Sequence, residues 1–408
     1  MAENKTKPSL RFRGFTDEWE QRKLLDCILK IIDFRGRTPK KLGMEWSESG
    51  YLALSALNVK DGYIDFSQDV HYGNQALYEK WMSGNELHMG QVLFTTEAPM
   101  GKVAQVPDNK PYILSQRTIA FDVKQNEITE NFLATVLRTP AVFSRLTALS
   151  SGGTAKGVSQ KSLSTVDVVI PSDLNEQEKL ADVFLHIDNL IALHQQKHEK
   201  LVNLEKSMLE KMFPQNGSAY PEIRFSGFTA PWEKRKFSDI AQRESTFRTS
   251  SSIYPSIEYE DVVAEVGLLN KDIRKKETHK TGIEFDGTQV LYGKLRPYLH
   301  NWLSPDFKGV AVGDWWVLRP LGIDKNFLFR LIQTRQFNEV ANQSSGSKMP
   351  RADWHLVSNM EFFIPKTSDE QSQIAKNFDD IDTLITLHQH KLEKLKNLKK
   401  SMLQRMFV

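Results

Sequence analysis

Two acidic residues and a lysine in the first half of the chain have the types and spacing of a metal-dependent nuclease site. Asp108 follows a proline, and Asp122 stands two residues before Lys124, which fits the loose proline–aspartate and acid-x-lysine pattern of such enzymes. Two carboxylates and a lysine could hold magnesium and orient a water molecule. The pattern is short, and the second half repeats Pro-Asp at 305–306 but has Leu-Arg-Pro at 318–320, where the acid-x-lysine segment should fall. A nuclease is therefore the less favoured alternative.

Other catalytic patterns do not occur in the sequence. There is no Asn-Pro-Pro-Tyr or Asn-Pro-Pro-Phe segment of a methyltransferase, and no His-Glu-x-x-His segment of a zinc hydrolase. The nearest approach to a phosphate-binding G-x-x-x-x-G-K-[ST] loop is Gly287 to Gly293-Lys294, which has five intervening residues and is followed by Leu295. The single cysteine, Cys27, allows no intramolecular disulfide and no cysteine zinc cluster. We expect no cofactor and no metal bound by this chain.

Basic and glycine-rich loops point to a different chemistry, contact with nucleic acid. Direct readout of bases needs Arg, Lys, Asn or Gln side chains at groove depth, and phosphates are held by cations and backbone amides. The first half offers Arg35, Gly36, Arg37, Thr38, Lys102, Arg117, Gly152, Gly153, Thr154 and Lys156. The second half offers Lys294, Arg296, Tyr298, His300, Ser345, Gly346, Ser347, Lys348 and Arg351. Surface basic loops are often only solvated, so each of these residues is a candidate for DNA contact.

Length and composition indicate a soluble protein of two domains. The chain has 408 residues, more than one ordinary core accommodates, with 40% hydrophobic and 26% charged residues. The net charge of +3 is small, so a nucleic-acid surface has to be local. The start of the chain has no apolar segment of a signal peptide, and no run is long enough to span a bilayer. We expect a cytoplasmic protein that is not associated with membranes.

The chain is an internal duplication. Residues 8–27 match residues 221–240 at 11 of 20 positions, and residues 170–213 match residues 364–407 at 25 of 44 positions without a gap. Between these shared blocks little aligns, apart from 90–104 with 288–302 and 150–171 with 344–365. A period of about half the chain is far too long for a solenoid. Two domains with a shared frame and divergent middles are therefore predicted.

Each divergent middle has the pattern of an α+β domain. Short β-rich runs such as "YILSQRTIAFDV" and "GVAVGDWWVLRP" alternate with Gly, Pro, Asp and Asn. Helical stretches occur at 130–149 and 325–343. We predict that Trp315 and Trp316 lie in the core.

The repeated ends are predicted to be long helices that pair. Leu180, Ile187, His194, Leu201 and Met208 recur every seven residues. Three positions later in each heptad follow Val183, Leu190, Lys197 and Leu204, with Phe184 and Ile191 beside them. The second copy repeats this spacing, with His388 at the position of His194. Such spacing favours a coiled-coil seam. Ser172 or Asp173 and Ser368 or Asp369 are candidate N-caps. If the helices ran antiparallel, the pair would be pseudo-two-fold symmetric, and His194 and His388 would fix its register.

The repeated segments resemble a known family, the DNA-specificity subunits of type I restriction-modification systems. The resemblance covers essentially the whole chain. It rests on "RFxGFTxxWExRK" at 11–23 and 224–236, on "IP" followed by "EQ" at 170–177 and 364–371, and on "SMLxxMF" at 207–213 and 401–407. The segments "DFRGRTPKK" at 33–41 and "SSGSKMPRADWHLV" at 344–357 are also similar to family loops.

The resemblance implies a fold of two target-recognition domains separated by two long helices. On this basis we expect recognition domain 1 at 1–170, helical spacer 1 at 171–217, recognition domain 2 at 218–365 and helical spacer 2 at 366–408. Each recognition domain would read one half of a bipartite site in double-stranded DNA.

The resemblance also implies the partners. Two modification subunits would dock on the helices and methylate adenine with S-adenosylmethionine, and restriction subunits would supply cleavage driven by ATP and magnesium. The chain itself would be a non-catalytic specificity subunit. A coiled-coil scaffold that joins two protein-binding domains, with no role in DNA recognition, stays open as the alternative from another class.

Overall fold

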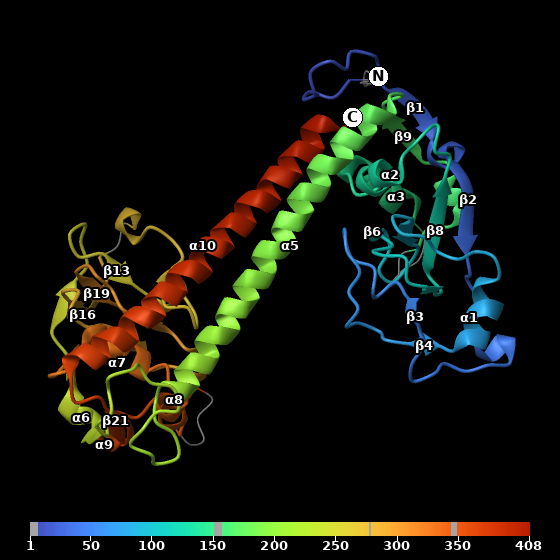
Figure 1. Cartoon of the computed structure of the whole chain (residues 1–408). Helices are drawn as coiled ribbons and strands as arrows, with labels where there is room; N and C mark the ends of the chain where they lie inside the picture. The colour runs from blue at the N-terminus through green and yellow to red at the C-terminus, as the bar shows by residue number, and fades with distance from the viewer. Residues whose placement is uncertain (1–6, 151–156, 277–278, 344–348) are drawn as a thin grey trace. The chain divides into compact units, whose positions relative to one another are not determined.

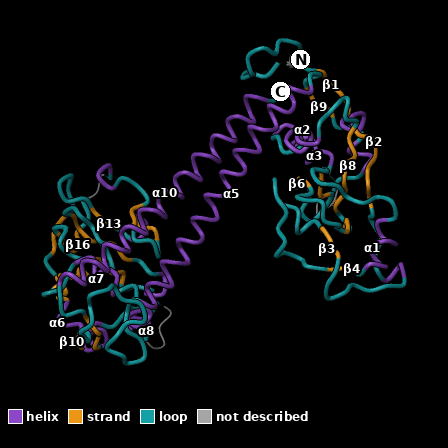
Figure 2. Tube along the Cα trace, viewed as in Figure 1, coloured by secondary structure: helices purple, strands orange, loops and turns teal. Residues whose placement is uncertain are grey.

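The computed structural model describes residues 7–150, 157–276, 279–343 and 349–408. The chain forms two compact units. Unit 1 comprises residues 1–195 together with 390–408, and unit 2 comprises residues 196–389. Each unit contains both helices and short strands, so the predicted α+β class is confirmed (Figure 2). No helix within the described ranges is both long and apolar enough to cross a membrane.

Unit 1 is built around a four-stranded antiparallel sheet. Its elements are β1 Glu20–Lys23, β2 Ile28–Asp33, β3 Tyr51–Leu54, β4 Tyr72–Gly73, α1 Gln75–Met82, β5 Val92–Thr95, β6 Val103–Gln105, β7 Ile113–Leu114, β8 Thr118–Val123, α2 Glu130–Val136, α3 Pro140–Leu149, α4 Gln160–Leu163 and β9 Asp167–Ile170. The central sheet has the order β2-β8-β5-β6, beside a smaller β4-β3-β7 sheet and the β1-β9 pair (Figure 1). Strand β5 is buried at all four positions, which fits a strand in the middle of a core.

Unit 2 repeats this plan. Its elements are β10 Glu233–Lys236, α6 Phe237–Ile240, β11 Ala241–Glu244, β12 Phe247–Thr249, β13 Ser256–Ile257, β14 Val262–Val263, β15 Leu268–Leu269, β16 Thr281–Phe285, β17 Val290–Gly293, β18 Trp302–Leu303, β19 Gly309–Ala311, β20 Trp315–Pro320, α7 Lys325–Leu331, α8 Arg335–Ala341, α9 Trp354–Asn359 and β21 Glu361–Ile364. Its central sheet is β11-β20-β17-β18. Trp315 and Trp316, both on β20, are 1% exposed, so the prediction that they are core residues is confirmed.

The helical stretches after each central sheet are interrupted. The predicted stretch 130–149 consists of α2 and α3, and 325–343 consists of α7 and α8. Each second helix starts after a threonine, Thr139 or Thr334, whose hydroxyl accepts a hydrogen bond from a backbone amide three residues on. These threonines act as N-caps, because they satisfy a free amide of the first turn.

The duplicated segments make duplicated contacts. Arg11 donates two hydrogen bonds to the carboxylate of Glu176, at 2.6 and 2.7 Å. Its counterpart Arg224 donates two to Glu370, at 2.7 and 2.9 Å. Both glutamates are buried and stand in the first turn of a long helix. A bidentate arginine–carboxylate pair therefore attaches each shared N-terminal segment to the start of a long helix.

The two long helices are α5, Leu174–Lys211, and α10, Ser368–Met406. The 38 residues of α5 correspond to about 57 Å at 1.5 Å per residue. Asp173 caps α5, because its side chain accepts from the amide of Asn175. The predicted caps of α10 are wrong by one or two residues. Thr367 holds that place, since its hydroxyl accepts from the amide of Glu370 at 3.3 Å.

Within each unit the helix segments run antiparallel, as predicted. In unit 1, Phe184 of α5 packs against Phe407, just beyond the end of α10, and Asp188 is 2.5 Å from Lys399. As residue numbers increase along α5, the contacting residues of α10 decrease in number, so the two helices run in opposite directions. In unit 2, Asn377 of α10 contacts the sulfur of Met208 on α5 at 3.8 Å.

Each helix ends in the core of a different unit from the one in which it begins. Phe213, two residues beyond α5, belongs to the unit 2 core, and Phe407 belongs to the unit 1 core. Figure 1 shows the C-terminus of α10 next to the start of α5, in unit 1.

The predicted seam is wrong in part. Leu190 and Leu204 were expected in it, but they are 45% and 46% exposed. The less exposed positions of α5 instead follow Leu180, Phe184, Ile187, Ile191 and His194, with alternating steps of four and three residues. Both patterns have a seven-residue repeat, and they differ only in which neighbouring stripe of the helix is buried.

Candidate nucleic-acid interface

Strained backbone marks the same end of the central sheet in both units. Eight described residues other than glycine have positive φ angles, and four of them lie at this end: Ala98 (45°) and Arg117 (66°) in unit 1, and Arg296 (49°) and His300 (52°) in unit 2. The other four are Asp69, Ser83, Asn216 and Glu265. Ala98 and Arg296 follow the ends of β5 and β17, and Arg117 directly precedes β8. Such conformations cost free energy and persist where function uses them. These turns are therefore the leading candidates for a binding surface.

In unit 1 the turn after β5 holds Arg117 by its side chain and its backbone. The guanidinium is 2.8 Å from the carboxylate of Glu97. The amide of Thr96 donates to the carbonyl of Arg117 at 2.8 Å, and the amide of Val158 donates to the carbonyl of Thr96 at 2.9 Å. Glu97 also forms an isolated β-bridge with Gly157. Gly157, the first described residue after the predicted glycine-rich loop, therefore lies beside the Glu97–Arg117 pair.

The predicted basic loop 35–38 is divided between exposed and internal roles. Arg35 is exposed, and its guanidinium is 2.6 Å from the carboxylate of Asp33. This carboxylate also accepts a hydrogen bond from the side-chain amide of Gln160. Burial by itself would raise the pKa of Asp33, but hydrogen bonds from Arg35 and Gln160 outweigh it and lower that pKa. The guanidinium of Arg37 lies over the ring of Phe34 and donates to a backbone carbonyl. Arg37 is therefore engaged within the unit, and Arg35 is the more accessible cation.

The other residues of this loop shape its turns. Gly36 has a φ of 78°, which favours glycine, and the hydroxyl of Thr38 accepts from the amide of Lys41. Lys102 lies in the turn between β5 and β6 and pairs with Asp61 at 2.6 Å.

In unit 2 the turn after β17 gathers two cations around one acid. The carboxylate of Asp314 is 3.1 Å from the guanidinium of Arg351 and 3.5 Å from the ammonium of Lys294. Leu295 forms a β-bridge with Arg351, and the amide of Arg296 donates to the carbonyl of Pro350 at 2.7 Å. Burial would raise the pKa of Asp314, but the hydrogen bond from Arg351 and its charge hold that pKa below its ordinary value. The structure thus brings together three of the predicted residues, Lys294, Arg296 and Arg351.

Tyr298 and His300 lie in the same turn. Tyr298 is exposed, whereas the ring of His300 stacks on Trp302 with centroids 5.1 Å apart, and its Nδ1 is 3.6 Å from Glu265.

Each unit has an ion pair at this sheet edge, Glu97–Arg117 in unit 1 and Asp314–Arg351 in unit 2, but the acid and the base are exchanged in position. Strand pairing places Thr95 opposite Thr118 in unit 1 and Gly293 opposite Trp315 in unit 2. The residue before β8 is Arg117 and the residue before β20 is Asp314, so a cation and an anion occupy equivalent positions. The carboxylates Glu97 and Asp314 were missed by sequence reasoning, which considered no acidic residue as part of a DNA-binding turn. The alignment of 90–104 with 288–302 already contained the Glu97 position.

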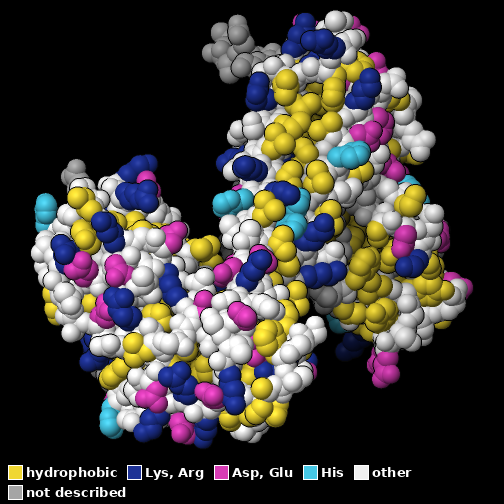
Figure 3. Space-filling model, turned by 60° about the vertical axis from the view of Figure 1, so that its left-hand side comes forward, with side chains coloured by type: hydrophobic (Ala, Val, Ile, Leu, Met, Phe, Trp, Pro, Cys, Tyr) yellow, Lys and Arg dark blue, Asp and Glu magenta, His cyan; other side chains and the backbone are white. Residues whose placement is uncertain are grey.

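Eight predicted residues lie outside the described residues. They are Gly152, Gly153, Thr154 and Lys156, and Ser345, Gly346, Ser347 and Lys348. On the face drawn in Figure 3, basic and acidic side chains are interspersed within each unit, so no single-sign field covers it. A DNA surface therefore has to be made of local clusters such as the two turns described above.

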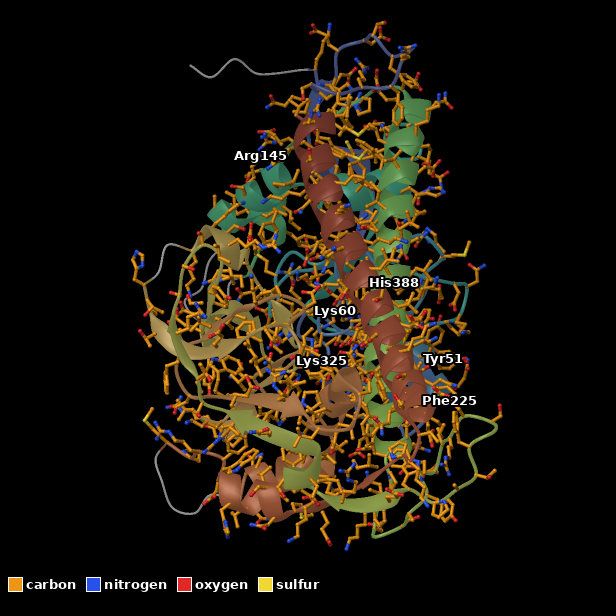
Figure 4. The ribbon with its side chains drawn as sticks, turned by 90° about the vertical axis from the view of Figure 1, so that its left-hand side faces the viewer. Tyr51, Lys60, Arg145, Phe225, Lys325 and His388 are labelled. Carbon is orange, nitrogen blue, oxygen red and sulfur yellow. The ribbon has the colours of Figure 1, made fainter. Side chains whose placement is uncertain are left out.

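The predicted histidines of the helix pair are half-buried on α5 and α10. His388 is labelled on α10 in Figure 4. Their role in fixing register stays a prediction.

Charged residues in the helix seam differ between the units. In unit 1, Asp188 contacts both Arg138 and Lys399 at 2.5 Å. In the alignment of the two repeats, Glu205 of the first copy corresponds to Lys399 of the second. In unit 2, Arg330 contacts Asp379 at 2.8 Å, Asp382 at 2.5 Å and Glu205 at 3.8 Å. Burial, followed by the charge of Asp382, raises the pKa of Glu205 to about 7. Lys325, labelled in Figure 4, is half-buried beside this cluster and donates to two backbone carbonyls.

The nuclease residues do not form a site. Asp108 accepts from the hydroxyl of Tyr112, Asp122 accepts from Gln91, and the ammonium of Lys124 donates to the carbonyl of Asp26. Across the part of the chain that the structure describes, no group of three His, Cys, Asp or Glu side chains is arranged to hold a metal ion.

Comparison with known proteins agrees with this duplicated architecture. The family model "Type I restriction modification DNA specificity domain" matches twice, at residues 16–203 and 230–397. The chain belongs to this family. Each match runs from a shared N-terminal segment, through the central sheet, into a long helix.

Individual relatives are distant. The Type I restriction enzyme EcoDI specificity subunit of Escherichia coli is 29% identical over 129 residues, which is 30% of this chain and 29% of that subunit. The matched stretch thus spans less than a third of that relative. The crystal structure of the S subunit of a type I restriction-modification system from M. genitalium has a TM-score of 0.66 at 13% identity and covers 98% of this chain and 99% of the other.

A second solved structure comes from a study of complex assembly and conformational transition in the type I R-M system. It has a TM-score of 0.50 at 14% identity and covers 95% of this chain and 97% of the other. At these identities the two structures support the fold.

Proposed function

We propose that this chain is the sequence-reading subunit of a type I restriction-modification complex, and that each unit reads one half of a bipartite site in double-stranded DNA. The observation that carries the proposal is the repeated turn at the end of the central sheet. The two units share their frame contacts to within a few tenths of an ångström, as in Arg11–Glu176 and Arg224–Glu370. They differ in the charged side chains at this turn, which is the expected pattern when one scaffold presents two different readers.

A DNA-reading turn needs cationic side chains on a backbone of defined conformation, and the turns after β5 and β17 have both. Arg117 and Arg351 are 55% and 53% exposed at the side chain, so they can reach a ligand. An arginine can make a bidentate contact with the O6 and N7 atoms of guanine, and lysine can contact bases or phosphates. We infer that these turns face the DNA.

We further propose that the chain is not catalytic and works with partner subunits in the cytoplasm. Modification subunits would supply S-adenosylmethionine chemistry, and restriction subunits would supply ATP- and magnesium-dependent cleavage. Supporting this view, each unit exposes the same leucines along the helices. Unit 1 exposes Leu190, Leu193 and Leu398, and unit 2 exposes the equivalent Leu384, Leu387 and Leu204. Two copies of one partner protein would find the same apolar stripe twice.

The direct test is to map methylated adenines in a host that carries this chain with its partner subunits. A split recognition sequence with two defined halves is expected. Exchanging residues 28–149 for the corresponding part of another family member should change one half and leave the other unchanged. A change in both halves, or methylation without sequence preference, would contradict the proposal.

The long helices are proposed to set the distance between the half-sites. Inserting one heptad into each of α5 and α10 adds roughly 10 Å per helix at 1.5 Å per residue. The non-specific spacer should lengthen by about three base pairs at 3.4 Å each, while both half-sites stay the same. An unchanged spacer would argue against this role.

A DNA-binding experiment distinguishes the proposed function from the alternative of a coiled-coil scaffold with no role in DNA recognition. Purified complex should retain unmodified genomic DNA on a filter, selectively and with an affinity that falls steeply with salt. Salt-insensitive or unselective retention, with the partner subunits present, would favour the scaffold.

A further inference from the structure

The acids at the sheet edge have no evident place in a DNA-binding surface. Glu97 and Asp314 lie beside the exposed arginines that are the best candidates for base contact, where a carboxylate repels phosphate. The side chain of Asp314 is only 27% exposed, whereas that of Arg351 is 53% exposed. A half-buried acid that holds an exposed arginine can restrict its rotamers without itself reaching the ligand.

The backbone around each acid is held as well. In unit 2 the phenol oxygen of Tyr259 accepts from the amide of Leu295 at 3.1 Å, and its hydroxyl donates to the carbonyl of Asp314 at 2.5 Å. The amide of Ala352 donates to the carbonyl of Lys294 at 2.8 Å. The carboxylate of Asp314 is thus fixed relative to the strand end, and its two cations are fixed relative to it.

We propose that Asp314 and Glu97 are positioning residues that determine sequence selectivity, Asp314 by aiming Arg351 and Glu97 by aiming Arg117, each at a guanine in its own half-site. This inference rests on the proposed function. An arginine whose guanidinium is held on one side by a carboxylate keeps other N–H donors for the O6 and N7 atoms of guanine, and loses less freedom on binding. The arginine lies on a different loop in each unit, because Arg117 directly precedes β8, whereas the position before β20 is taken by Asp314 and Arg351 lies before α9.

The acid also acts against wrong sequences. Without the guanine contact, an arginine can turn to the nearest phosphate, which gives affinity without selectivity. A fixed carboxylate keeps the arginine away from that alternative and adds local repulsion of the backbone. Removal of the acid should therefore lower selectivity and strengthen non-specific binding together.

The test uses Asp314→Asn in the full complex with its modification subunits. The amide keeps the shape of the side chain and removes its charge. We expect methylated sites to accept other bases at one guanine position of one half-site, with preference there reduced roughly 5- to 150-fold, while the other half-site is unchanged. Affinity for DNA without a target site should rise. Glu97→Gln should relax the opposite half-site.

The matched control is Asp286→Asn. Asp286 is exposed and pairs with Arg319 at 3.3 Å, but it precedes β17 and so lies toward the other end of the same central sheet. This variant should leave both half-sites unchanged.

The outcomes separate the two ideas. If the wild-type complex methylates without sequence preference, the proposed function fails. If the wild type is selective and Asp314→Asn keeps full selectivity, the positioning role fails. If Asp314→Asn weakens binding to all DNA equally and lowers Tm more than Asp286→Asn does, then Asp314 is structural and the inference is overturned.

Discussion

Truncation of Phe407 should destabilise unit 1, although this residue stands at the far end of the sequence from most of that unit. Phe407 is 8% exposed, and its ring centroid lies 5.6 Å from that of Phe184, 5.9 Å from Phe132 and 6.1 Å from Trp19. Phe213 is the equivalent residue in unit 2 and lies 5.5 Å from Phe327. The two phenylalanines thus form a matched pair.

The magnitude follows from the size of the cavity. Replacement of a buried phenylalanine by alanine costs about 3–5 kcal/mol. Phe407 keeps some solvent contact, so we expect a cost at the lower end of this range, about 3 kcal/mol. At about 1.4 kcal/mol per factor of ten, amides that exchange through unfolding of unit 1 should exchange about 100-fold faster.

Hydrogen–deuterium exchange read by mass spectrometry measures this effect. In Phe407→Ala, peptides from β8 and α2 should lose protection, and peptides from β20 and α7 should not. Phe213→Ala should give the reverse result, and Phe407→Leu should show a smaller effect than Phe407→Ala. Loss of protection in unit 2 in response to Phe407→Ala would refute the assignment of the C-terminus of α10 to the core of unit 1.

Three further outcomes are expected. The pKa of Glu205 is raised by burial and by Asp382, so the folded state holds this proton more tightly and stability falls as pH rises from about 4.5 to about 7. Glu205→Gln removes that loss and should stabilise unit 2 by about 2 kcal/mol at pH 8 but not at pH 4.5, as read from Tm. Arg224→Ala leaves Glu370 buried without its cation and should cost about 3 kcal/mol, and adding Glu370→Gln should recover part of it in denaturant titration. Burial raises the pKa of the Cys27 thiol, so iodoacetamide should label it only in denaturant, and rapid labelling of native protein would contradict its place in the core.

Much of the architecture could be predicted because it is local or repeated. The duplication, the two long helices and the core position of Trp315 follow from periodicity, turn residues and hydrophobicity, and Asp173 is one of the two residues predicted to cap α5. The alignment of 90–104 with 288–302 is also confirmed, since Val92 and Val290 hold the same place in paired strands.

The sequence by itself determined that there are two similar frames with different middles, because repetition and helical periodicity are visible within short windows. Only the tertiary structure decided which helix stripe is buried, which unit each helix end completes, and which acid holds which arginine. Leu190 and Ile191 are neighbours in the sequence yet differ in exposure, and a seven-residue repeat fits either of them. Asp314 and Arg351 are 37 residues apart. Their pairing depends on how the strands bring two turns together, and no local pattern encodes that distance.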